Sequence, residues 1–232
     1  MAITPRFNDF NGGSDGTLIT TANSGGVSGT AFDAAGTATY LASDGYPPGG
    51  LCAVNATTNI DTLTWSGFAL TGNSLFTRQH IRIASYPASE APILFGFAAS
   101  STQVARLNLS PTGKLVLRYS PAQTQAGIST TSVPLDTWVR IETEMTTNDV
   151  SSHFRVWLYT DPQALVETEL VDTAPNLSTS KIVQQNFYMP DSITYRLDSI
   201  GIAETAIGRV TIPSVARASM VAPTAIHRAS RW

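Results

Sequence analysis

Cysteine is nearly absent from this sequence, and so is lysine. Cys52 is the only cysteine among the 232 residues, so no disulfide can form within the chain and the fold must depend on packing. Cys52 lies in the apolar stretch 50–54, which favours a small buried hydrophobic side chain over a reactive thiol. Hydrophobic residues amount to 42%, which is enough for one core, and a single domain is expected at this length.

Charge is scarce as well. Asp, Glu, Lys and Arg make up 13% of the sequence, with 12 Arg, 2 Lys and a formal net charge of -3. Nucleic-acid binding needs a clustered basic surface, and the basic residues here are scattered, so we expect no nucleic-acid partner. The preference for Arg suits planar hydrogen bonding at an interface, although GC-rich coding alone would also produce it.

Long apolar runs and helical patterns are both missing. No apolar run approaches the roughly 20 residues that a membrane-spanning helix needs, and no export signal opens the sequence. We therefore expect no membrane partner. No stretch of about a dozen residues repeats apolar positions at the i, i+3, i+4 spacing of an amphipathic helix.

Alternation of apolar and polar residues is what the sequence does contain. Short alternating segments recur about every 8 to 12 residues between Gly- and Pro-rich turn signals. This pattern predicts an all-β sandwich of two antiparallel sheets. The predicted strands are residues 6–10, 17–21, 38–41, 50–54, 61–65, 74–83, 92–98, 104–109, 114–119, 138–145, 154–159, 164–171, 185–189 and 195–203.

Two turns carry specific expectations. Residues 110–113, Ser-Pro-Thr-Gly, are typical of a turn because Pro presets φ at the first corner and Gly accepts a positive φ. We expect the strands of 104–160 to form one antiparallel meander, with a small polar loop between 119 and 138. The pair Asp15-Gly16 likewise predicts a hairpin that joins 6–10 to 17–21.

Several of these segments resemble one fold family. Thr112-Gly-Lys-Leu115, Trp138-Val-Arg-Ile-Glu142 and the closing segment 195–203 resemble the concanavalin A-like, laminin-G-like jelly roll. The resemblance implies a jelly-roll domain over residues 1–206. It leaves residues 207–232 as a C-terminal extension, either a floppy tail or an arm that docks on a neighbouring subunit. In the arm, the candidate partner-docking residues are Arg217, Arg228, Arg231 and Trp232, because Arg and Trp are favoured interface anchors.

The family includes glycan hydrolases, whose catalytic residues are acidic. Those enzymes carry Glu-x-Asp-x-x-Glu on a strand, and the nearest match here is Glu142-Thr-Glu144 with Thr147 at the third position. Because the acid pattern is broken, we predict no catalytic residues and no enzymatic activity. Glu142 and Glu144 are instead expected on the solvent face of a strand.

Aromatic residues on one strand are the candidate ligand-binding site. Trp157 and Tyr159 share a face of their strand, opposite Phe154, Val156 and Leu158. An outward pair of rings would suit a glycan or a protein partner. Burial under a loop is the alternative for both rings.

Metal-binding patterns are weak. His80, His153 and His227 are far apart and have no partner at zinc-ligand spacing, so no metal site is predicted. Laminin-G-like domains often bind calcium, and the resemblance leaves calcium as an alternative. Its ligands would be Asp61, Asp136, Asp149 and Asp198 at a rim of the sandwich.

The opening residues 7–13 and 21–26, with a Gly-, Ser- and Thr-rich and nearly Lys-free texture, resemble jelly-roll virion proteins of tailed phages that infect actinobacteria. The resemblance implies a non-enzymatic virion protein, a head-decoration or minor tail component assembled in the host cytoplasm. Its expected partners are capsid or tail proteins, further copies of itself and a cell-surface glycan. The alternatives are a carbohydrate-binding module or lectin and, third, a glycan hydrolase.

Overall fold

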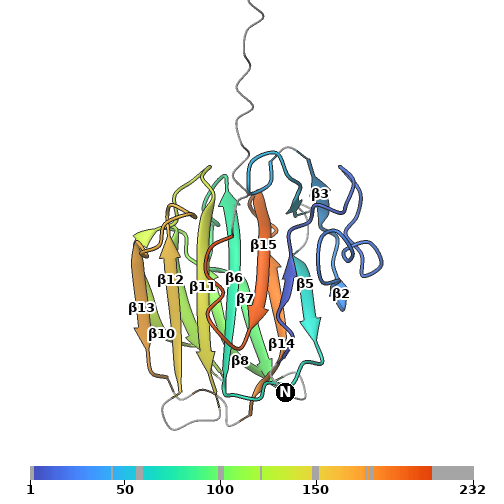
Figure 1. The fold of residues 1–232 in the computed structure, drawn as a ribbon. Coiled ribbons are helices and arrows are strands. Elements are labelled where there is room, and N and C mark those ends of the chain that lie inside the picture. The colour runs from blue at the N-terminus through green and yellow to red at the C-terminus, as the bar shows by residue number, and fades with distance from the viewer. Residues whose placement is uncertain are drawn as a thin grey trace, which may run out of the picture.

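The computed structural model describes residues 3–42, 44–55, 60–98, 102–120, 122–147, 152–175, 177 and 180–210. These residues form two antiparallel sheets packed face to face, which we call sheet A and sheet B (Figure 1). None of the described residues is helical, and they therefore include no helix that could cross a membrane. The all-β prediction and the jelly-roll sandwich are both confirmed.

Sheet A, in front in Figure 1, has the strand order β13-β12-β11-β6-β15-β4-β3, and β1 also pairs with β15. All pairings are antiparallel. Its strands are β1 (Arg6–Asn8), β3 (Thr39–Leu41), β4 (Cys52–Val54), β6 (Ser74–Ile83), β11 (Val139–Thr146), β12 (His153–Tyr159), β13 (Glu169–Thr173) and β15 (Tyr195–Ala203).

Sheet B lies behind sheet A and has the order β10-β9-β8-β7-β14-β5-β2. Its pairings are antiparallel too. Its strands are β2 (Ala34–Ala35), β5 (Asp61–Ser66), β7 (Ala91–Ala98), β8 (Gln103–Leu109), β9 (Lys114–Tyr119), β10 (Thr124–Ser132) and β14 (Ile182–Met189).

The core lies between the sheets. Every second side chain of a strand points inward, so the apolar members of the alternating segments meet across the sandwich. Trp65 is fully buried, with its ring 5.2 Å from Phe32 and 5.7 Å from Phe187. Each such large side chain stabilises the fold by about 1.5–3 kcal/mol through removal from water.

The expected single meander is wrong, because residues 104–160 divide between the two sheets. β8 and β9 pair with each other and lie in sheet B, whereas β11 and β12 lie in sheet A. The chain changes sheets after β10, a strand that the sequence analysis took for a polar loop. β10 is an edge strand rich in Thr and Ser, and the residue that it fully buries is Ser129, so no apolar face reveals it in the sequence.

The predicted hairpin between residues 6–10 and 17–21 is also wrong. β1 pairs with β15, and Leu18 forms an isolated bridge with Thr39 instead. Phe10 interrupts the extended chain, since it has a φ of 61° and is fully buried in the core. Burial of the Phe10 ring therefore decided the path of this segment over the local Asp15-Gly16 turn signal.

The last described segment returns over sheet A after β15. Figure 1 shows residues 204–210 in red, in front of β6 and β11. Glu204 anchors its start by accepting hydrogen bonds from the N–H and hydroxyl of Thr71. The predicted boundary at residue 206 is untested, and the rest of the predicted arm, from residue 211, lies outside the described residues.

Candidate functional site

The outer face of sheet A, here called the outer A face, carries a dense set of charged and aromatic side chains. In the strand register Arg78 lies opposite Glu142, and Glu142 lies opposite Trp157. Trp157 in turn lies opposite Leu170 on the edge strand β13. Its residues are Phe76, Arg78, His80, Arg82, Arg140, Glu142, Glu144, Arg155, Trp157, Tyr159, Leu170, Asp172, Arg196 and Asp198.

Ion pairs connect neighbouring strands across the outer A face. Glu144 of β11 lies 3.2 Å from Arg155 and 3.1 Å from His153, both on β12. Arg155 also lies 2.9 Å from Asp172 on β13. At the other side of the sheet, Asp44 pairs with Arg82 and Arg196. The side chains are thus held in fixed positions, which favours recognition of a polar ligand.

Arg140 and Glu142 form a deeply buried ion pair. Arg140 Nε lies 2.8 Å from Glu142 Oε1, and the two side chains are 3% and 10% exposed. The two atoms are not aligned for a hydrogen bond, so the attraction is mainly that of the opposite charges. Arg140 also donates hydrogen bonds to the carbonyls of Pro162 and Ala164, which hold the loop between β12 and β13 onto the sheet.

Arg78 and Glu142 lie beneath the segment that follows β15. Arg78 Nη1 donates to the Gly208 carbonyl at 3.0 Å, and its Nε donates to the Ser199 carbonyl at 3.0 Å. Burial lowers the pKa of Arg78 to about 10, which leaves the guanidinium charged at neutral pH. Burial also raises the pKa of Glu142, against the opposing effects of Arg140, Arg78 and the Gly208 N–H.

Glu142 and Glu144 share one face of β11, as the alternation with Val139, Ile141 and Met145 predicts. The expectation that this face is solvent-exposed is wrong, because each Glu is only 8% exposed. Glu142 lies under the segment at Gly208, and Glu144 lies against His153 and Arg155 of the adjacent strand β12. Both carboxylates have arginine partners, as buried carboxylates require.

Trp157 and Tyr159 both lie on the outer A face, while the intervening residues of β12 fill the core. Trp157 is partly exposed next to Leu170, which is 42% exposed. Tyr159 is buried, because the Arg140 guanidinium lies 3.7 Å from its ring centre. The alternative of burial therefore holds for Tyr159. A ligand-binding role stays a prediction for both residues.

The cluster of His80, Asp198 and Tyr46 was missed in the sequence. The His80 ring stacks on Tyr46 with centroids 4.5 Å apart, and His80 lies opposite Asp198 in the strand pairing. Burial, followed by the charge of Arg78, lowers the pKa of His80 to about 3, while burial raises the pKa of Asp198 well above its usual value. The polar residues at alternate positions within 74–83 were the signal in the sequence that could have revealed this cluster.

Metal-ligating side chains do not gather in the part of the chain that the structure describes. No group of three His, Cys, Asp or Glu could hold an ion among those residues. His80 is buried in the cluster above, and His153 pairs with Glu144. His227 lies outside the described residues.

The four aspartates named for calcium are not brought together. Asp61 belongs to sheet B and accepts a hydrogen bond from the Thr37 N–H at 2.7 Å, whereas Asp198 belongs to sheet A. Asp136 lies in the turn before β11 and is exposed. Asp149 lies outside the described residues. No described arrangement of these carboxylates therefore favours a calcium site.

Cys52 is fully buried, and burial raises the pKa of its thiol to about 12. The prediction of a small buried hydrophobic residue is confirmed. The predicted partner-docking residues, Arg217, Arg228, Arg231 and Trp232, lie outside the described residues.

Comparison with known proteins shows that this chain is similar to solved structures in fold only. No protein-family model and no curated protein sequence matches this chain. Among solved structures, the chain is similar to domain 4 of AbnA, a GH43 extracellular arabinanase from Geobacillus stearothermophilus, in complex with arabinotriose. The identity is 16%, the match covers 90% of this chain and 95% of that chain, and the TM-score is 0.52.

Two forms of the VIP36 exoplasmic/lumenal domain are similar as well. The metal-free form has 9% identity over 82% of this chain and 92% of that chain, with a TM-score of 0.51. The Ca2+/Man2-bound form has 9% identity, 83% and 89% coverage and a TM-score of 0.50. The chain also spans 30% of the length of Trypanosoma rangeli sialidase, with 13% identity, 88% coverage of this chain and a TM-score of 0.48. What this protein shares with the arabinanase domain and with VIP36 is the jelly-roll β-sandwich fold.

Proposed function

We propose that this protein is a glycan-binding module that presents the outer A face to its ligand. The observation that carries the proposal is the partly exposed Trp157 beside Leu170, with the ion pair of Arg155 and Asp172, 35% and 46% exposed, two residues further along the same strands. An aromatic ring next to fixed hydrogen-bonding groups is the arrangement that specific small-ligand sites use. The saccharide complexes of the AbnA domain and of VIP36, which have the same fold, support this choice.

Glycan binding without cleavage is part of the proposal. A glycosidase needs two carboxyl groups with access to the glycosidic bond, one as acid and one as nucleophile or base. Glu142 is paired with Arg140 and lies under Gly208, and Glu144 is paired with Arg155. Mass spectrometry of a bound glycan after prolonged incubation with the protein is expected to show no shorter product. Release of a shorter oligosaccharide would contradict this part.

The test of binding is a glycan array probed with the full chain, followed by titration of the best glycan with Trp157→Ala. Loss of the ring is expected to weaken binding roughly tenfold or more, as for an aromatic hot spot. Phe97→Ala is the matched control, because Phe97 is a partly exposed aromatic residue of sheet B. Absence of any glycan binding, or equal affinity of Trp157→Ala and the unmodified chain, would overturn the proposal.

A second candidate is a structural role in a tailed-phage particle, as a head-decoration or minor tail component. It is supported by the resemblance of residues 7–26 to such proteins and by the Arg- and Trp-containing extension 211–232. In this setting the glycan would lie on the host surface, and the partners would be capsid or tail proteins and further copies of the chain. The particle would be assembled in the host cytoplasm.

Deletion of residues 211–232 tests the particle role and keeps the contact of Gly208 with Arg78. The shortened protein is expected to fold and to be lost from purified particles, as measured by immunoblotting. Incorporation at normal occupancy would contradict a docking role for the extension.

A further inference from the structure

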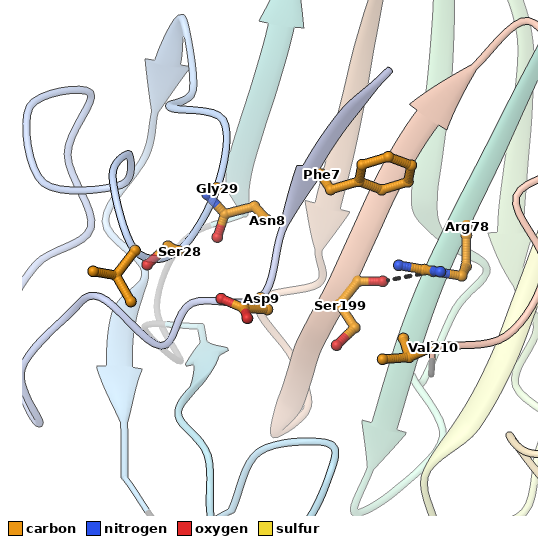
Figure 2. A pocket seen from close by; sticks show the side chains of 9 residues that line it. Phe7, Asn8, Asp9, Ser28, Gly29, Arg78, Ser199 and Val210 are labelled. Atoms are coloured by element: carbon orange, nitrogen blue, oxygen red, sulfur yellow. Dashed lines mark hydrogen bonds between the residues drawn. The ribbon is translucent and has the colours of Figure 1, made fainter. Parts of the chain in front are cut away.

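A pocket of about 280 Å³ opens beside β1, β6 and β15, at one end of the outer A face (Figure 2). It continues the row that begins at Trp157, since Arg78 pairs with Gly201 on β15 and Gly201 pairs with Phe7 on β1. Its volume is just below the range of about 300–1,000 Å³ that is usual for ligand pockets. The pocket is therefore large enough for one sugar residue rather than for a long chain.

Arg78 supplies the hydrogen-bond donor of this pocket. It is 8% exposed, and Figure 2 shows its guanidinium reaching the pocket from β6. Nε and Nη1 are held by the carbonyls of Ser199 and Gly208. Nη2 has no hydrogen-bond partner among the described residues, and it is not sealed from solvent. The fixed guanidinium can therefore donate to a ligand without losing its own support.

Asp9 supplies the acceptor. Its Oδ1 accepts a hydrogen bond from the Asn11 N–H at 3.1 Å, which fixes the carboxylate in an Asx turn. Oδ2 accepts no hydrogen bond from the described residues. The neighbouring Asn8 is fully used inside the protein, since its amide bonds the Ser24 and Thr30 carbonyls. Asp9 is thus the carboxylate available to hydroxyl groups in the pocket.

Apolar groups form the walls. Phe7 is 39% exposed, and its ring packs against β15 where Gly201 has no side chain, since a Cβ there would lie 2.4 Å from the ring. The Arg78 guanidinium carbon lies 5.6 Å from the centre of the same ring. Val27, 83% exposed, and Val210 line other parts of the pocket. An aromatic wall beside a donor and an acceptor suits a ring with both CH and OH groups.

We propose that this pocket binds one neutral sugar residue of a glycan, with adjacent hydroxyl groups hydrogen-bonded to Asp9 and Arg78 and its ring against Phe7. This inference rests on the proposed glycan-binding function. It adds where one sugar subsite lies and that the sugar bound there is uncharged. An acidic sugar is disfavoured because a carboxylate that pairs with Arg78 is repelled by the Asp9 carboxylate in the same pocket. A basic ligand is disfavoured by Arg78 for the same reason.

The experiment measures binding of methyl mannopyranoside, methyl galactopyranoside, methyl arabinofuranoside and glucuronate to the full chain by ligand-observed NMR. At least one neutral glycoside is expected to bind with a millimolar Kd, and more tightly than glucuronate. Val27→Trp, which places a ring over the pocket mouth, is expected to abolish the signal. Asp9→Asn is expected to weaken it at least about fivefold, since it removes the charge and keeps the Asx turn.

Two variants control for effects on the fold. Leu18→Trp adds the same ring at another exposed position, and Asp15→Asn makes the same change at an Asp that accepts a backbone hydrogen bond from Ala42. Both are expected to bind like the unmodified chain. If Val27→Trp and Asp9→Asn bind normally while Trp157→Ala weakens glycan binding, the subsite is wrong and the proposed function stands. If no saccharide binds to the full chain, both the subsite and the proposed function are contradicted.

Discussion

The outer faces of sheet A and sheet B belong to one sandwich but differ in chemistry. On sheet A, charged side chains are buried under loops, as with Arg140 and Glu142 at 3% and 10% exposure. On sheet B, aromatic rings gather instead, with Phe95 stacked on Phe97 at 5.7 Å. An ion pair at this sheet, Glu90 with Arg118, has both side chains about a quarter exposed.

Burial of charged side chains is not the most effective way to stabilise a fold, so the difference between the two faces bears on function. Two well-packed apolar residues commonly stabilise a fold as well as a buried ion pair does. On sheet B the Arg106 guanidinium carbon lies 5.7 Å from the centre of the Phe95 ring, and burial lowers the pKa of Arg106. The pair on sheet A is more buried than the pair on sheet B, so its removal from water costs more free energy. The contrast between the two outer faces can be tested by substitutions on each of them.

The largest effect is expected from Arg140→Ala. It leaves the buried Glu142 carboxylate without its ion-pair partner and releases the loop carbonyls of Pro162 and Ala164. Unfolding in urea is expected to show a loss of about 3–5 kcal/mol. Arg118→Ala on sheet B is the matched control, with a smaller expected loss of about 1–2 kcal/mol because that pair is bidentate but more exposed than the pair of Arg140 and Glu142. Equal losses would refute the contrast between the two faces.

The next effect is a dependence on pH that arises on sheet A. His80 is buried as the neutral form, with a pKa of about 3 against 6.5 for the unfolded chain. The unfolded state binds the proton first, so stability is lost as pH falls below about 6.5, by ~3 kcal/mol at pH 4 if His80 acted alone. Asp198, with a raised pKa, opposes this, since it loses stability as pH rises above its unfolded pKa.

His80→Phe separates the two contributions, because it keeps the ring beside Tyr46 and removes the titration. Urea unfolding between pH 4 and 7 is expected to give a smaller rise of stability with pH for His80→Phe than for the unmodified chain. Arg78, Arg140 and Asp198 face the same cluster and are unchanged in both proteins. Parallel curves would mean that His80 does not titrate in this range.

A smaller effect is expected where β1 joins the outer A face. Gly201→Ala places a Cβ 2.4 Å from the Phe7 ring, which must move away from β15. The expected loss is about 1–3 kcal/mol in thermal or urea unfolding, as for overpacking. Gly72→Ala is the control, since no atom lies within 4 Å of its added Cβ. Equal stability of both variants would show that Phe7 is not held at this position.

The smallest effect concerns the edge where the two sheets meet. The Glu169 carboxylate of β13 accepts hydrogen bonds from the N–H groups of Thr130 and Thr131 in β10, at 2.6 and 2.7 Å. Glu169→Ala is expected to cost about 1 kcal/mol. Hydrogen exchange at these two amides should accelerate while exchange in β11 stays unchanged. Unchanged exchange at both amides would show that Glu169 does not protect this edge.

Prediction from the sequence worked best for long strands whose inward positions are mostly apolar. Residues 74–83, 114–119 and 195–203 were predicted with the bounds that the structure has. It failed at β10, whose polar residues resemble those of a loop, and at Phe10, whose burial overrides a turn signal. It placed Trp157 and Tyr159 on one face, because alternation is a local property, but it could not separate the exposed ring from the buried one.

By itself the sequence determined the all-β class, the antiparallel pairs β8–β9 and β11–β12, the buried state of Cys52 and the face on which Glu142 and Glu144 lie. These follow from period-two alternation and turn chemistry, which act over a few residues. Only the tertiary structure decided which sheet each strand joins, and that Gly208 and the loop at Pro162 cover the charged face. It also decided that Asp9, Phe7 and Arg78 meet at one pocket, because contacts between segments distant in sequence depend on how the two sheets are assembled.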